Sequence, residues 1–238
     1  MPKLTLNHEA LLPIALAWSV MLFTAALVFL TSRLCRWSKG VTGILMLTVP
    51  LGNTSFVGIP LLQAFLGSEA LPYAILYDQF GTFLALNTVG VAIASITQPT
   101  TNTKHRYGTY IISFPPFITL LIAFCCRWLE YPEWLNEVLP RMAQTLVPVD
   151  MVAVGLQWRL RLDRKHLQPL TIGLVYLLLL SPLFTWALLK MLTVEGLVAK
   201  VIILEPAMPS MISAGVLATS HHLAPPNSPH PSWATVLQ

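Results

Sequence analysis

The chain has 238 residues, of which 55% are apolar and only 10% are charged, whereas a soluble domain carries roughly 25% charged residues. This deficit excludes an ordinary soluble protein and indicates that lipid is the solvent. The formal net charge of +4 does not predict nucleic-acid binding, because the basic residues stand in short loops between apolar runs, where membrane topology signals lie. The three cysteines show no spacing typical of a metal site.

Seven apolar stretches are candidates for membrane-spanning helices, which need about 20 residues to cross about 30 Å of hydrocarbon. In chain order they are 11–30, 41–66, 71–96, 110–126, 139–157, 170–189 and 201–219. The first is too long for the apolar region of a signal peptide and leads directly into a basic loop, so we interpret it as a retained span. Because backbone polar groups in lipid must be satisfied internally, we predict an all-α membrane protein with about seven transmembrane helices.

The basic residues also predict the orientation of the spans. If the segment after the first span is cytoplasmic, nine of the fourteen Lys and Arg residues lie in inside loops. We therefore expect a multi-pass protein of the cell (inner, cytoplasmic) membrane, with the N-terminus outside and the C-terminus in the cytoplasm. Residues 220–238 are rich in proline, which breaks helices, and are predicted to be a disordered tail.

Two of the spans contain residues that interrupt a helix. A proline lacks an N–H and frees the carbonyl four residues before it, and here polar side chains stand at the same depth. The interrupted part of 41–66 holds Pro50, Gly52, Asn53, Thr54, Ser55, Gly58 and Pro60, and that of 201–219 holds Glu205, Pro206, Met208 and Pro209. Simple proline kinks are the alternative. Paired broken helices in the two halves of a chain nevertheless favour a transporter binding site.

Three acidic residues within predicted spans are candidates for proton coupling: Asp78, Asp150 and Glu205. A charge at the bilayer centre costs about 2.5–3.5 kcal/mol on insertion scales, so such an acid should face a cavity or a partner, or carry a proton. For Asp78, near the outer end of its span, exposure at the membrane interface is an equally good interpretation. No paired-acid or metal constellation of a membrane enzyme is present, so we predict no enzymatic activity, no cofactor and no metal.

Four stretches resemble the auxin efflux carrier family of secondary transporters, the prokaryotic members most closely: 52–61, 73–79, 148–157 and 205–209. The resemblance implies a ten-helix fold of two inverted repeats, in which two broken helices cross near the membrane midplane at a proline. By motif these prolines correspond to Pro60 and Pro209, which we expect to lie close together.

On this fold the first repeat is expected at 1–97, with its broken helix at 41–66, and the second at 98–219, with its broken helix at 201–219. Two N-terminal helices and the last helix of the family are expected to be missing. The first, second, third, sixth and seventh spans correspond to the family's moving transport unit, and the fourth and fifth to its scaffold. Asp150 stands where the family pattern predicts an apolar residue.

The resemblance implies transport of small organic anions by a secondary carrier, either dicarboxylates such as malate and malonate or auxin-like acids. Expected partners are the lipid bilayer, the organic anion and a coupling proton or sodium ion, with a homo-oligomer as a further option. The expected substrate-binding residues are Asn53, Thr54, Ser55, Gly58, Pro60, Glu205, Met208 and Pro209. The alternative is a truncated, non-transporting membrane fragment or subunit that needs another chain.

Overall fold

The computed structural model describes residues 8–97, 118, 122, 125, 126, 132–157, 164–220 and 223, although for part of the helical residues only the backbone is described. Within these ranges all regular structure is helical and no strand occurs. The predicted class, an all-α membrane protein, is confirmed. The count of seven spans and the ten-helix arrangement stay predictions.

Three helical runs are long and apolar enough to cross a membrane: Leu11–Leu34, Ser68–Thr97 and Leu167–Met191. They correspond to the first, third and sixth predicted spans. The first lies in α1 (His8–Leu34). The second combines η2 (Ser68–Ala70), α4 (Leu71–Leu76), η3 (Tyr77–Phe83), η4 (Leu86–Gly90) and α5 (Val91–Thr97), and the third combines α9 (Arg164–Val175), η6 (Tyr176–Leu180) and α10 (Ser181–Met191).

The second and last predicted spans are each broken in the middle, as the prolines and glycines predict. The second divides into α2 (Lys39–Thr48), a π-helical turn η1 (Thr54–Gly58) and α3 (Ile59–Leu66). The last divides into α11 (Gly196–Leu204), a 3₁₀ turn η7 (Glu205–Ala207) and α12 (Ile212–Ser220). Each α-helical half is about 8–10 residues long, so it covers roughly half of the bilayer at about 1.5 Å per residue.

Local chemistry accounts for the ends of these half-helices. The side chain of Ser38 caps α2 by accepting a hydrogen bond from the N–H of Val41, and the side chain of Asn53 does the same for η1 with the N–H of Phe56. At the other end, α3 stops at Gly67, whose φ of 83° lies in the left-handed region that glycine adopts without strain.

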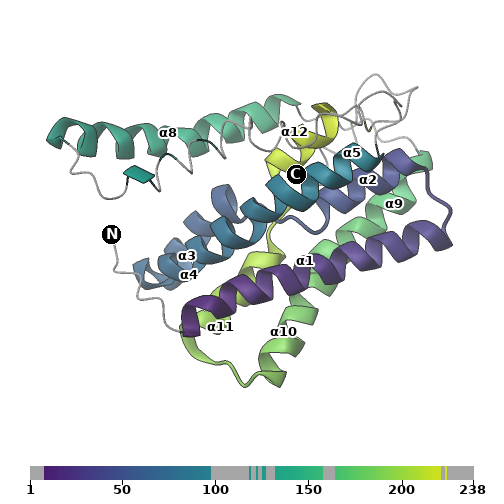
Figure 1. Cartoon of the computed structure of the whole chain (residues 1–238), viewed down its shortest axis with the longest axis horizontal. Coiled ribbons are helices and arrows are strands. Elements are labelled where there is room, and N and C mark those ends of the chain that lie inside the picture. Colours follow the sequence, from purple (N-terminus) through teal and green to yellow (C-terminus); the bar gives the residue numbers. More distant parts are fainter. Residues whose placement is uncertain are drawn as a thin grey trace. The chain divides into compact units, whose positions relative to one another are not determined.

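The two broken spans run in opposite directions past each other. The second half of the last span, α12, packs against α2, whereas its first half, α11, packs against α3 and α4. Figure 1 shows α2 and α12 together at one end of α1 and α3, α4 and α11 at the other. The prediction of two broken, crossing helices is therefore confirmed. Their apolar core, between α1, α2, α5 and α12, includes Ile44, Leu45, Leu47, Leu86 and Met211.

The chain divides into two compact units, residues 1–101 with 159–238, and residues 102–158. The first unit holds the spans assigned to the moving transport unit, and the second holds those assigned to the scaffold, including α8 (Glu133–Gln157). The roles of these units, and the assignment of 1–97 and 98–219 to inverted repeats, stay predictions. Most of the fourth span and of the predicted tail lies outside the described residues.

Candidate functional site at the crossing of the broken helices

The two helix breaks are joined through their backbones. Gly52 and Ser210 form an isolated antiparallel bridge. The N–H of Asn53 donates to the carbonyl of Pro209 at 2.6 Å, and the N–H of Met211 donates to the carbonyl of Leu51 at 2.8 Å. Each break thus satisfies backbone groups of the other, which hydrocarbon could not do. Gly52 and Ser210 form the non-hydrogen-bonded kind of antiparallel pair, in which the N–H and C=O groups of each residue point away from the other residue.

The two backbones lie close together at Gly52, although a Cβ atom there would still meet ordinary van der Waals distances. A Cβ atom at this position would lie 3.4 Å from the carbonyl oxygen of Glu205 and 3.7 Å from that of Met208. The carbonyl of Glu205 has no helical donor, because Pro209 lacks an N–H. It accepts a hydrogen bond from the N–H of Met208 at 3.2 Å instead. The unwound segments are therefore held by specific hydrogen bonds.

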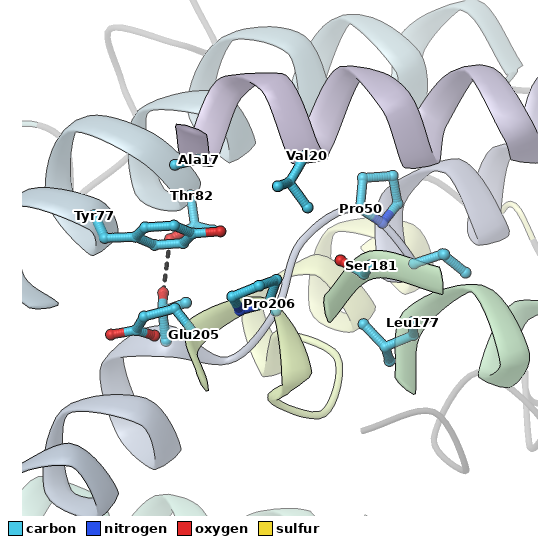
Figure 2. A pocket seen from close by; sticks show the side chains of 12 residues that line it. Ala17, Val20, Pro50, Tyr77, Thr82, Leu177, Ser181, Glu205 and Pro206 are labelled. Carbon is cyan, nitrogen blue, oxygen red and sulfur yellow. Dashed lines mark hydrogen bonds between the residues drawn. The ribbon is translucent and has the colours of Figure 1, made fainter. Parts of the chain in front are cut away.

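A small cavity lies beside this crossing, and Figure 2 shows Tyr77 and Thr82 on one side, Pro50, Ser181 and Leu177 on the other, and Pro206 between them. Its volume is about 10 Å³, which is close to the minimum for one water molecule. Its lining comes from α1, both broken spans, η3 and the sixth span. In this state the cavity is too small for a dicarboxylate.

Asp78 connects the third span to the broken second span. Its carboxylate oxygen Oδ1 accepts hydrogen bonds from the hydroxyls of Thr54 and Ser55, both at 2.5 Å, and Oδ2 accepts from the amide of Gln79 at 2.8 Å. The hydroxyls of Thr54 and Thr82 lie 2.6 Å apart, marked by the dashed line in Figure 2. Asp78 is completely buried, so the interpretation as an exposed interfacial residue is wrong.

Glu205 is a buried carboxylate whose charge has no hydrogen-bonding partner among the described residues. It is completely buried, and neither of its carboxylate oxygens has a hydrogen-bond partner within the described part of the chain. It packs against the backbone of Gly58, where a Cβ atom would lie 2.5 Å from Oε2. Thr54, which donates a hydrogen bond to Asp78, lines the same cavity as Glu205. A buried ion in this setting needs a proton or a cation.

The other predicted site residues are placed as follows. Asn53, Thr54 and Gly58 are buried, Ser55 is half-buried, and Met208 and Pro209 lie at the crossing. The hydrogen-bond partner of Pro209 is Asn53, and the expected closeness of Pro60 and Pro209 stays a prediction. Pro60 is an exposed residue in the first turn of α3, which continues directly from the π-helical turn η1. Asp150 lies in α8, but its side chain is outside the described part of the structure.

Comparison with known families decides the family of this chain. A family model described as "Membrane transport protein" matches residues 3–109 and 106–228, which together make up most of the chain. The chain belongs to the membrane transport protein family. The resemblance to auxin efflux carriers is thereby confirmed.

Two relatives of this membrane transport protein come from archaea. An "Uncharacterized transporter" of Methanothermobacter thermautotrophicus is 28% identical over 201 residues, which are 84% of this chain and 65% of the relative. A similarly named protein of Methanocaldococcus jannaschii is 27% identical over 214 residues, 85% of this chain and 67% of the relative. The chain thus spans about two thirds of the length of these relatives.

Four residues of the transport protein's site were not predicted from the sequence: Tyr77, Thr82, Ser181 and Ser210. The first three line the cavity. Ser210 is completely buried beside the bridge, and its hydroxyl has no hydrogen-bond partner among the described residues. Its position directly after Pro209 in the sequence could have identified Ser210 as a site residue. The others lie on unbroken helices whose sequence does not indicate which side faces the crossing.

Proposed function

We propose that this chain carries small organic anions across the membrane as a secondary transporter, with dicarboxylates such as malate and malonate as its substrate class. The observation that carries the proposal is the antiparallel bridge between Gly52 and Ser210, which holds two helix breaks against each other beside buried polar groups. Unwound backbone at this depth is characteristic of transporter binding sites.

The donors for a carboxylate come from the backbone and from hydroxyls. The N–H groups of Gly52 and Ser210 point to opposite outer sides of the bridge, so each offers a donor only to an acceptor on its own side. The hydroxyl of Ser210 is unpartnered among the described residues, and α12 begins two residues later with the positive end of its dipole. On the side that Ser210 faces, these donors can attract an anion although no basic side chain is present among the described lining residues.

Charge balance requires that a cation accompanies this anion. None of the described residues that line the cavity is basic, while Glu205 lines it and Asp78 is hydrogen-bonded to Thr54 of the same lining. An entering dicarboxylate would meet like charge in a site of low dielectric constant. We therefore propose that Glu205 carries the coupled proton. A sodium ion, which would need several oxygen ligands, is the alternative coupling ion.

Entry of the substrate requires a second conformation. Because the cavity holds at most one water molecule, we propose that the segments around the crossing separate toward one side of the membrane at a time. The lining then becomes wet, and Glu205 can exchange its proton with water on that side. Alternating access of this kind links the proton to the anion.

Uptake by proteoliposomes tests the proposal. The purified chain is reconstituted, and entry of radiolabelled malonate is measured with and without an inward proton gradient. We expect saturable uptake that malate inhibits and the gradient accelerates. Glu205→Gln should abolish the acceleration. Glu69→Gln, which removes an exposed carboxylate from the same unit, should retain it.

Four results would overturn parts of this proposal. Absence of saturable uptake by a well-folded chain would reject transport by this protein. Stronger inhibition by an auxin-like aromatic acid than by malate would assign a different substrate class. Acceleration by a sodium gradient alone, or an unchanged proton response in Glu205→Gln, would reject the role of Glu205.

A further inference from the structure

A pocket separate from the crossing lies where the end of α1, the start of α2 and the end of α5 meet. It has a volume of about 470 Å³ and shares no lining residue with the cavity at the crossing. Its lining combines two basic residues with an indole and large apolar side chains, namely Arg33, Lys39, Trp37, Phe29, Ile93 and Ile96. The pocket therefore offers both a cationic and an apolar wall.

The cationic wall has no anion of its own. The guanidinium of Arg33 lies 5.1 Å from the centroid of the Phe29 ring, a cation–π contact that holds it in place. In the described part of the chain neither Arg33 nor Lys39 forms an ion pair, and no acidic residue lines the pocket. An arginine fixed in this way is suited to bind a phosphate through two parallel hydrogen bonds.

Trp37 provides a second, independent indication of a ligand. Its indole N–H is buried and has no acceptor within the described residues. Buried donors are almost always paired in native proteins. The indole ring of Trp37 lines the pocket beside both cations, and its N–H can reach a bound molecule once the side chain turns toward the pocket.

The apolar wall determines which kind of anion fits. Phe29 is 46% exposed and Ile96 is 80% exposed, at the end of two helices long enough to cross the membrane. A small dicarboxylate would leave these side chains uncovered, whereas an acyl chain would cover them. The basic loop between α1 and α2 is also predicted to be cytoplasmic, where anionic lipids concentrate.

We propose that this pocket binds one anionic phospholipid, with the phosphate at Arg33, Lys39 and the indole N–H of Trp37, and an acyl chain along Phe29 and Ile96. The lipid stabilises the junction of α1, α2 and α5 and is not a substrate. The proposal rests on the membrane location of the chain and does not depend on which anion is transported.

The test compares two lipids on the delipidated chain in an uncharged detergent. Phosphatidylglycerol and phosphatidylcholine with identical acyl chains are titrated, and binding is measured by native mass spectrometry together with the rise in melting temperature. We expect saturable binding of one phosphatidylglycerol and a higher melting temperature, and weaker binding of phosphatidylcholine. Inorganic phosphate and malonate should not raise the melting temperature.

Matched charge variants locate the site. Arg33→Gln and Lys39→Gln should each weaken phosphatidylglycerol binding about fivefold, and the double variant about thirtyfold, since one basic residue near an anionic membrane surface contributes about that factor. Arg36→Gln removes a charge from the same loop but not from the pocket, so it should bind normally.

Equal weakening by Arg36→Gln would show general surface attraction and overturn the proposal. Equal binding of the two lipids, or binding of phosphate or malonate as strong as that of the lipid, would overturn it as well. If the double variant does not fold, the comparison of the two lipids on the unmodified chain still decides.

Discussion

Removal of the Asp78 carboxylate should loosen the contact between the third span and the broken second span. In Asp78→Ala, the hydroxyls of Thr54 and Ser55 and the amide of Gln79 lose their acceptor. Hydrogen bonds to a charged group contribute about 1.5–3 kcal/mol each, but Thr54 and Thr82 remain paired at 2.6 Å and Ser55 is only half-buried. We therefore expect a net loss of about 2 kcal/mol in the free energy of unfolding.

Thermal unfolding of the purified chain in detergent measures this loss. For a chain of this size, about 2 kcal/mol corresponds to a fall of roughly 4–8 °C in melting temperature. Asp78→Asn should lose less, because its amide oxygen still accepts from Thr54 and Ser55. Thr24→Val is the control, since the buried hydroxyl of Thr24 bonds only to carbonyls of its own helix.

The comparison with the control makes the result interpretable. If Asp78→Ala melts at the temperature of the unmodified chain, or no lower than Thr24→Val, Asp78 does not hold the two spans together. If Asp78→Asn melts as low as Asp78→Ala, the carboxylate charge matters rather than its hydrogen bonds, and the reasoning from geometry is wrong.

Three further predictions concern other contacts of the same unit. Gly58→Ala should destabilise the chain by about 1–3 kcal/mol, because the added Cβ would lie 2.5 Å from Oε2 of Glu205; Glu205→Ala should restore part of this loss in a double-mutant cycle of melting temperatures, and an additive result would contradict the contact. Trp18→Phe removes the hydrogen bond from the indole to the carbonyl of Phe80 at 2.9 Å and should cost about 1 kcal/mol in denaturant unfolding, whereas no change would show that the bond is replaced by another. A variant that keeps only the exposed Cys35 should react with a membrane-impermeant maleimide from the cytoplasmic side, and labelling from outside would reverse the predicted orientation.

The class of this protein and the places where its helices break are local properties, so the sequence determined them. The apolar length of α1 predicts a span by itself, and Pro50 and Pro206 predict breaks because proline removes a helical hydrogen bond wherever it stands. The family followed from the same stretches, since these unusual residues are close together along the chain.

The site depended on contacts between distant segments, and only the tertiary structure decided them. Gly52 pairs with Ser210, across most of the length of the chain, and the hydrogen bond from Asn53 to Pro209 follows from no local pattern. The sequence left Asp78 open between exposure and function, because its burial depends on hydroxyls more than 20 residues away. Local patterns fix which backbone groups lose their helical partners, but the groups that replace those partners are brought close only when the two broken helices cross.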